Sequence, residues 1–211
     1  MASPALTVAI LAGGRAERLG GRDKGLEPLG GRALVEHVVD AVAAMDAGAA
    51  FAPDEASSLP APLLIVANRH PVIYARLAPT IGDALAGFRG PLAGVAAALA
   101  ACRTPWLLTV PVDCPDPPRD LARRLAGAAC RTAAPAVVAD DGERAQPLFA
   151  LYRRTLAASA AAAAEAGRGV RHWQAALGAR TVDFADRRRQ FRNLNTPDEF
   201  AAHAAARRPE T

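Results

Sequence analysis

Residues Leu11 to Gly25, LAGGRAERLGGRDKG, combine glycines and cations in a way that suits phosphate binding. The backbone N–H groups of a glycine-rich loop can approach phosphate oxygens closely. Four cations lie in this stretch: Arg15, Arg18, Arg22 and Lys24. Lys24 is the only lysine among the 25 Lys and Arg residues, and a compact ammonium fits between crowded oxygens where a guanidinium would clash. We therefore predict a triphosphate-binding loop; the alternatives are a solvated glycine turn and a lysine kept by chance.

This loop matches neither of two familiar phosphate-binding motifs. A Walker A loop needs Ser or Thr after its Gly-Lys pair, whereas Asp23 precedes Lys24 and Gly25 follows it. The dinucleotide fingerprint G-x-G-x-x-G is also missing from the stretch. The sequence therefore favours a phosphate loop of another kind.

Asp113 is the second candidate for phosphate chemistry. It closes the apolar run from Trp106 to Val112, so its carboxylate is expected at the end of a buried strand. Mg²⁺ takes few protein oxygens beside bound phosphates, and one carboxylate in this position suits it. The alternative for Asp113 is a turn or helix cap ahead of Pro117, and a capping role is what we expect of Asp116.

The segment Thr196-Pro197-Asp198-Glu199 spells a capping box with proline at the first helical position. Asn193 and Asn195 precede it, and a ligand role for them is left open. Neither a Ser-His-Asp or Cys-His arrangement nor an HExxH motif emerges from the sequence. An anionic phosphate that attacks needs only alignment and charge neutralisation from the protein, so the absence of such motifs agrees with phosphate chemistry.

Alternating strands and helices must position these residues. The hydrophobic pattern predicts strands at 6–11, 63–67, 106–112, 136–139, 147–152 and 181–184, and helices at 33–45, 71–77, 91–102, 119–129, 156–166, 170–177 and from 197. This order predicts one α/β domain over 1–211 with a mostly parallel sheet. Residues 46–62 are expected to be a flexible insertion, and 205–211 a frayed tail. Gly13 and Asp113 both follow strand ends, where ligands bind in such sheets.

Composition limits the partners of the chain. The net charge is +4, but aromatic residues make up only 5% and the arginines are scattered, so nucleic acid is not an expected partner. The three cysteines form no CxxC pair, which favours a reducing cytoplasm over a disulfide framework or a zinc site. With no signal-peptide pattern and no apolar run of about 20 residues, we expect a cytoplasmic protein without a membrane span.

Six motifs in order resemble the bacterial molybdenum cofactor guanylyltransferase family: LAGGRAERLGGRDKGL, ANRH, GPLAG, PVDCP, DGERAQP and NLNTPDEF. The resemblance covers nearly the whole chain. It implies a single Rossmann-like domain, a three-layer α/β sandwich whose mostly parallel sheet has one antiparallel strand. Gln146 stands where the family commonly has histidine, and Cys114 where threonine is typical.

The resemblance also implies roles for individual residues. Those implied to bind the guanine nucleotide are Leu11, Ala12, Gly13, Gly14, Lys24, Asn68, Asp83, Gly94 and Asp113. Lys24, Arg18 and Asp113 would serve catalysis, with Asp113 as the Mg²⁺ ligand. The residues implied to face the pterin substrate are Gly21, Asp141, Arg144, Gln146, Asn193 and Asn195.

The implied reaction transfers GMP from GTP to the terminal phosphate of the molybdenum–pterin cofactor and releases pyrophosphate. Mg²⁺ would be the cofactor, and a molybdoenzyme or its chaperone would receive the product. Two alternatives stay open: a cytidylyl- or sugar-nucleotide transferase of the same fold, and a carrier that binds the pterin without turnover. Related cytidylyltransferases tend to carry Leu-Ala-Ala-Gly at the loop, whereas this chain has Leu11-Ala12-Gly13-Gly14, which favours GTP.

Overall fold

A seven-stranded sheet forms the centre of the protein in a computed structural model that describes residues 5–13, 22–51, 61–83 and 90–206. Its order is β5-β4-β1-β6-β8-β7-β9. The strands are β1 (Leu6–Leu11), β4 (Leu63–Val66), β5 (Thr80–Ile81), β6 (Trp106–Pro111), β7 (Ala136–Asp140), β8 (Ala145–Arg153) and β9 (Arg180–Asp183). Strand β8 runs antiparallel to both β6 and β7, and the other neighbouring pairs are parallel. The predicted fold class, with one antiparallel strand, is confirmed.

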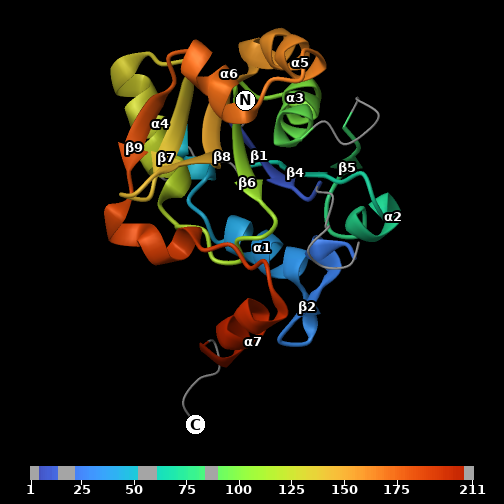
Figure 1. The fold of residues 1–211 in the computed structure, drawn as a ribbon. Helices are drawn as coiled ribbons and strands as arrows, with labels where there is room; N and C mark the ends of the chain where they lie inside the picture. The colour runs from blue at the N-terminus through green and yellow to red at the C-terminus, as the bar shows by residue number, and fades with distance from the viewer. Residues whose placement is uncertain (1–4, 14–21, 52–60, 84–89, 207–211) are drawn as a thin grey trace.

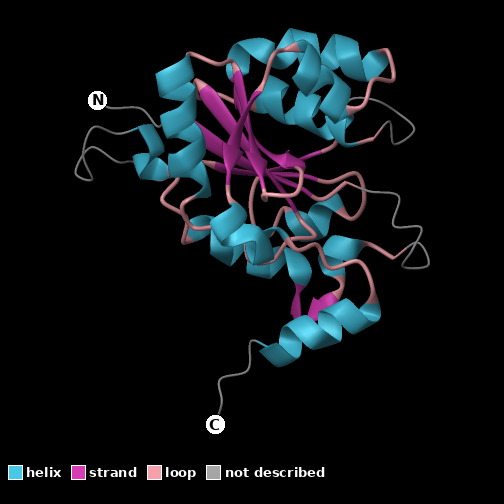
Figure 2. Ribbon diagram, turned by 60° about the vertical axis from the view of Figure 1, so that its left-hand side comes forward, coloured by secondary structure: helices cyan, strands magenta, loops and turns pink. Residues whose placement is uncertain are grey.

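Helices cover both faces of this sheet, which makes three layers (Figures 1 and 2). One face carries α3 (Pro91–Ala101), α5 (Ala157–Glu165) and α6 (Val170–Ala176); the other carries α1 (Leu34–Ala43) and α4 (Leu121–Thr132). Within β1, Val8 and Ile10 join the core beneath α1 and α4, while Ala9 and Leu11 join the opposite core. This alternation is what the period-2 geometry of a strand requires when both faces are covered.

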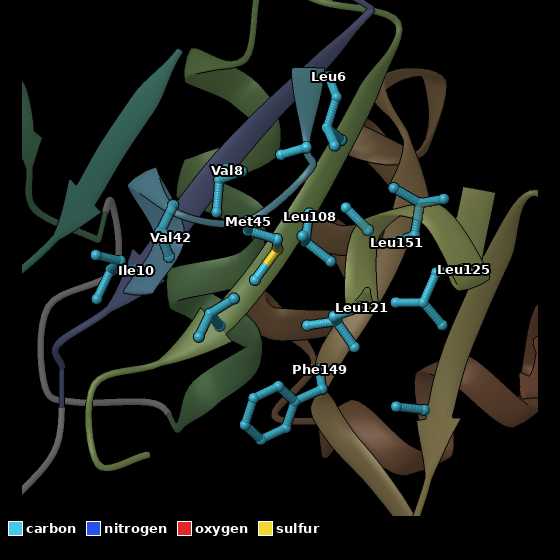
Figure 3. Close-up of a cluster of buried hydrophobic side chains, with 14 of the residues drawn as sticks. Leu6, Val8, Ile10, Val42, Met45, Leu108, Leu121, Leu125, Phe149 and Leu151 are labelled. Atoms are coloured by element: carbon cyan, nitrogen blue, oxygen red, sulfur yellow. The ribbon is translucent and has the colours of Figure 1, made fainter. Parts of the chain in front are cut away.

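The core beneath α1 and α4 holds the strand ends in place (Figure 3). Leu108 of β6 and Leu151 of β8 are fully buried there, together with Leu121 and Leu125 of α4. Each such side chain stabilises the fold by about 1.5–3 kcal/mol through burial. The sheet is therefore a rigid support for the loops that follow its carboxyl ends.

A small separate unit carries the end of the chain. Strands β2 (Pro28–Leu29) and β3 (Arg32–Ala33) form a hairpin beside α7 (Pro197–Ala206), away from the main sheet (Figure 1). Gly30 and Gly31 form its turn with φ of 59° and 89°, a conformation that favours glycine. The cluster that joins hairpin and helix consists of Leu29, Leu34, Leu194 and Phe200. This packing fixes the segment that leads into α7.

The expected insertion 46–62 and the expected tail 205–211 lie only partly within the described residues. Residues Gly48–Phe51 form a 3-10 helix, η3, and Phe51 stacks on Trp106 with ring centroids 5.2 Å apart. The expected insertion 46–62 is therefore packed at its start, because Phe51 supplies apolar area to bury; residues 52–60 lie outside the described part. Helix α7 runs through Ala206, so the expected tail is helical at 205–206, and 207–211 also lie outside.

The capping role expected of Asp116 is wrong. Helix α4 begins at Leu121, two residues later than predicted, and its N-cap is Asp120, which makes no side-chain capping bond. The segment 117–118 is a Pro-Pro pair, which holds the chain outside the helix. Asp116 instead lies 2.9 Å from His203 Nε2 of α7.

Short elements complete the described fold: η2 (Lys24–Leu26), α2 (Pro71–Tyr74), η5 (Arg154–Leu156) and η6 (Ala185–Phe191). Among the helices in the described ranges, none has the length and apolarity needed to cross a bilayer.

Candidate active site

The chain leaves four neighbouring parallel strands at one edge of the sheet. The ladder continues just past the strand ends, since Ala12 N donates to Val66 O at 2.8 Å, Ala67 N to Ile81 O at 2.8 Å, and Val112 N to Leu11 O at 3.1 Å. The segments after β1, β4, β5 and β6 therefore start at the same level. Gly13, Asn68, Asp83 and Asp113 lie in these segments, as expected for a ligand site in such a sheet.

Lys24 joins two distant parts of the chain at this edge. Its Nζ donates to Asp113 Oδ2 at 2.9 Å and to Asn195 Oδ1 at 2.7 Å. The side chains of Lys24 and Asp113 are 20% and 23% exposed, so their ion pair is largely shielded but still open to a ligand. The backbone also ties these segments together, because Leu194 N donates to Asp113 O at 2.8 Å. The predicted cation and carboxylate thus meet in one cluster, and Asn195 belongs to it.

Asp113 keeps one carboxylate oxygen available. Its Oδ1 is buried and has no hydrogen-bond partner among the described residues. A buried charged oxygen without a partner is costly, so a bound cation or donor would stabilise it. The described residues contain no group of three His, Cys, Asp or Glu side chains placed to hold a metal. The site therefore fits an ion that takes one protein carboxylate and fills its other positions with phosphate oxygens and water, as Mg²⁺ does.

Asp23 and Tyr74 hold the backbone that carries Lys24. Asp23 Oδ1 accepts from Tyr74 Oη at 2.7 Å and from Gly25 N at 3.1 Å. Tyr74 is fully buried, and burial, followed by the nearby Asp23 carboxylate, raises the pKa of its phenol well above the ordinary value. A Cβ atom on Gly25 would overlap Tyr74 Oη, so only glycine fits there. Sequence reasoning missed this support, because Tyr74 lies 51 positions from Asp23 and no local motif links them.

The capping box at α7 positions Asn195. Glu199 Oε2 accepts from Asn195 N at 2.6 Å and from Thr196 N at 2.9 Å, and Glu199 N lies 3.3 Å from Thr196 Oγ1. The predicted capping box is confirmed. The bond from Asn195 N is the main cause that lowers the pKa of Glu199, so this carboxylate is ionised at neutral pH. The start of α7 thus fixes the backbone of the residue that binds Lys24.

Asn68 and Asp83 form a pair beyond β4 and β5. Asn68 Nδ2 donates to Asp83 Oδ2 at 2.6 Å, and Asp83 N donates to Asn68 Oδ1 at 2.8 Å. Gly13 lies beside them, since a Cβ atom there would be 3.8 Å from Asn68 Nδ2. Gly94 sits in α3 instead, where a Cβ atom would be 3.7 Å from Leu11 Cδ2. The structure brings Gly13, Asn68 and Asp83 together and places Gly94 behind Leu11.

Asp141, Arg144 and Gln146 meet at the turn between β7 and β8. Asp141 Oδ1 accepts from the backbone N–H groups of Glu143 and Arg144, each at 2.9 Å, and Gln146 Nε2 donates to Asp141 Oδ2. Burial alone would raise the pKa of Asp141, but these hydrogen bonds and the Arg144 charge outweigh it and lower that pKa. Both oxygens of Asp141 are thus occupied by its own turn.

The remaining predicted site residues are Asn193, Gly14, Arg18 and Gly21. The Oδ1 atom of Asn193 is buried without a hydrogen-bond partner among the described residues. Gly14, Arg18 and Gly21 lie outside the described residues.

A glycine segment, a shielded lysine and a carboxylate with one free oxygen, all at the carboxyl edge of a doubly wound sheet, define a nucleotide-binding α/β protein. Comparison with known proteins specifies the class. Residues 8–181 match the model of the MobA-like NTP transferase domain. The chain is 39% identical over 198 residues to a molybdenum cofactor guanylyltransferase from Shewanella sp. (strain MR-4), covering 93% of each chain. It is 38% identical over 192 residues to one from Photobacterium profundum, covering 90% of this chain and 91% of that one.

The chain belongs to the molybdenum cofactor guanylyltransferase family. A solved structure shares its fold: the molybdopterin-guanine dinucleotide biosynthesis protein A from Archaeoglobus fulgidus, with a TM-score of 0.72 and 22% identity, covering 95% of this chain and 97% of that one. The family predicted from the six sequence motifs is confirmed.

Proposed function

We propose that the protein transfers GMP from GTP to the terminal phosphate of the molybdenum–pterin cofactor and releases pyrophosphate. The observation that carries this proposal is the contact of Lys24 with both Asp113 and Asn195 at the carboxyl edge of the sheet, in a chain whose relatives bear the name molybdenum cofactor guanylyltransferase. A carrier that only binds the pterin would have no need for this arrangement of a cation beside a carboxylate with a free oxygen.

The chemistry requires charge neutralisation and alignment more than a nucleophile from the protein. An oxygen of the pterin phosphate attacks the α-phosphorus of GTP, and the bond from that phosphorus to the bridging oxygen of the β-phosphate breaks. The bonding electrons leave with pyrophosphate, where negative charge accumulates. Lys24 neutralises this charge as a compact cation held by Asp113 and Asn195. Its fixed position lowers the reorganisation needed in the transition state.

Asp113 would hold Mg²⁺ through its free Oδ1 atom. When bound, Mg²⁺ would neutralise phosphate charge and orient the phosphate oxygens. The Lys24 ammonium already faces Oδ2 of the same carboxylate, so Asp113 can bind the metal on one side and position the lysine on the other.

Guanine would bind near Asn68 and Asp83. Guanine presents N1–H and N2–H donors, and the Asp83 carboxylate, oriented by Asn68, would accept them. Cytosine lacks this pair of donors and would leave the acceptors unsatisfied. Gly13 lies beside the pair, where the absence of a side chain leaves room for a ligand close to the backbone.

The pterin would lie toward the β7–β8 turn. Asn193, with its buried free Oδ1, would line that side together with Arg144 and Gln146, which the Asp141 carboxylate holds in place. The product would then pass to a molybdoenzyme or its chaperone.

Product analysis tests the proposal. The full chain is incubated with Mg²⁺, the pterin cofactor and each NTP in turn, and pyrophosphate is measured together with the mass of the pterin product. We expect stoichiometric pyrophosphate and a guanine dinucleotide only with GTP. Pterin binding without pyrophosphate release would identify a carrier, and a cytosine dinucleotide would identify a cytidylyltransferase; either result would overturn the proposal.

A further inference from the structure

A cavity of about 610 Å³ lies away from the candidate active site. It is formed by α1, the segment after Asp113, the end of η6, and α7. None of Lys24, Asp113, Asn68 and Asp83 lines it, so it is distinct from the candidate active site. Its walls come from four parts of the chain, which makes it concave on several sides. Its volume falls within the range of about 300–1,000 Å³ typical of small-molecule sites.

Positive charge dominates this cavity. Arg119, Arg189 and Arg192 line it, and neither Arg119 nor Arg189 forms an ion pair within the described ranges. The carboxylates that line it already have partners: Asp40 lies 2.7 Å from Arg32, and Asp116 lies 2.9 Å from His203. The three arginines outnumber these two carboxylates, so the lining keeps an excess of positive charge that favours an anion.

The neighbouring arginines of η6 make the contrast clear. Arg187 lies 3.6 Å from Asp186 and 3.8 Å from Asp120, and Arg188 lies 2.6 Å from Glu143. Arg189 follows directly and faces the cavity instead. One short helix thus presents both paired arginines and an arginine whose charge is available to a ligand.

Gln190 also lines the cavity, and its side chain carries an unsatisfied hydrogen-bond acceptor. Its Oε1 is buried and has no hydrogen-bond partner among the described residues. Its backbone is fixed, since Cys114 Sγ donates to Gln190 O at 3.0 Å. A buried amide oxygen is stabilised by an N–H or O–H donor, which an inorganic anion alone supplies poorly. Pro115 and Pro117 give the cavity apolar wall area for the rest of a ligand.

We propose that this cavity binds a small phosphorylated compound that carries an N–H or O–H donor next to its phosphate. Arg119, Arg189 and Arg192 would hold the phosphate, and Gln190 Oε1 would accept from the donor. This proposal goes beyond the transfer reaction and does not depend on it.

The test uses the full chain with its nucleotide site saturated by GTP and Mg²⁺, without pterin. Binding of inorganic phosphate and of ribose 5-phosphate is measured by calorimetry for the wild type, Arg119→Gln and Arg189→Gln, with Arg187→Gln as the matched control on η6. We expect each of the two cavity variants to weaken phosphate binding by about three- to tenfold, and the control to change it little. Ribose 5-phosphate should bind the wild type more tightly than phosphate does, and Gln190→Leu should remove that difference.

Equal phosphate affinity in all variants would overturn the proposal. An equal loss of affinity in Arg187→Gln would also overturn it, because it would indicate that general surface charge binds the phosphate. Steady-state kinetics distinguish two sources of the ligand. If the ligand is the pterin acceptor, Arg189→Gln raises the KM of the acceptor and leaves that of GTP unchanged, and the proposal of a ligand separate from the transfer reaction is overturned. If it is another metabolite, both KM values stay unchanged. Failure of binding here would leave pyrophosphate release intact, so the two proposals fail separately.

Discussion

Asp113 and Asp141 both follow a strand at the carboxyl edge of the sheet, but their carboxylates are used differently. Both oxygens of Asp141 accept hydrogen bonds from its own turn and from the start of β8, within five positions of the chain. Asp113 binds Lys24, 89 positions away, with one oxygen and keeps the other free in a buried position. The first carboxylate is consumed by local structure, while the second is held ready for a ligand. Hydrogen-bond satisfaction therefore distinguishes Asp141 from Asp113, the aspartate that we propose binds a ligand, where strand position does not.

Among the substitutions that leave Asp113 in place, the largest effect is expected for Lys24→Arg. The guanidinium keeps the charge but cannot occupy the slot of an ammonium between Asp113 and Asn195, where the contacts are 2.9 and 2.7 Å. We expect kcat to fall by about a hundredfold or more, as when one transition-state donor is lost. Activity within about twofold of the wild type would show that lysine is not required as a point charge.

The base preference is the next largest effect. We expect kcat/KM for GTP to exceed that for CTP by on the order of a hundredfold on the same pterin substrate, because cytosine leaves two acceptors near Asn68 and Asp83 unpaired. Asp83→Asn should reduce this ratio by weakening the guanine contacts. Equal kcat/KM values for the two nucleotides in the wild type would refute the assignment of the base site.

Asp141→Asn should affect stability rather than turnover. The neutral amide loses charge-assisted hydrogen bonds from Glu143 N and Arg144 N, so we expect the free energy of unfolding to fall by about 1.5–3 kcal/mol. The pKa of Asp141 is lower in the folded state than in the unfolded state. The ionised carboxylate therefore stabilises the fold at pH values above the unfolded-state pKa of about 3.9. This stabilisation is lost as the pH falls through the folded-state pKa.

Chemical denaturation between pH 7 and pH 3 measures this contribution. The difference in unfolding free energy between the wild type and Asp141→Asn should shrink as the pH falls below about 4. A difference that stays constant over this range would show that the charge of Asp141 does not stabilise the turn.

Tyr74→Phe should have the smallest effect. It removes the bond from Tyr74 Oη to Asp23 Oδ1 and leaves the buried ring in place, so Lys24 becomes less well positioned. We expect kcat to fall by about fivefold, with KM for GTP nearly unchanged, which corresponds to about 1 kcal/mol. An equal fall in thermal stability and activity, with no change in kcat of the folded fraction, would indicate a purely structural tyrosine.

Local patterns allowed the sequence to predict much of the fold. Strand β1 matched its predicted bounds because the apolar run is uninterrupted and ends at a glycine pair. The hairpin of β2 and β3 was missed, since its strands have two residues each and show no periodicity. Strand β5 was missed for the same reason. Short strands depend on neighbours that are distant in the sequence, which a local pattern cannot contain.

The candidate site, like the fold, could be predicted from the sequence only in part. The residue types of Lys24 and Asp113 predicted phosphate chemistry, and the structure places them 2.9 Å apart. The bond of Asn195 to Lys24 joins residues 171 positions apart, and the support from Tyr74 depends on where α2 packs. Such contacts are set by the tertiary fold, so sequence spacing could not reveal them. The contact of Phe51 is also set by the tertiary fold. The sequence around Phe51 predicts a loop, but its ring stacks on Trp106.

The most direct test of the central claim compares turnover of Asp113→Asn and Asp141→Asn as a function of Mg²⁺ concentration, with GTP and the pterin cofactor saturating. We predict that Asp113→Asn remains folded and loses activity by about a thousandfold at every Mg²⁺ concentration, because a neutral amide is a poor ligand for this cation. Asp141→Asn should keep turnover within about threefold of the wild type under conditions where it is folded. Near-normal, Mg²⁺-dependent turnover in Asp113→Asn would contradict the account.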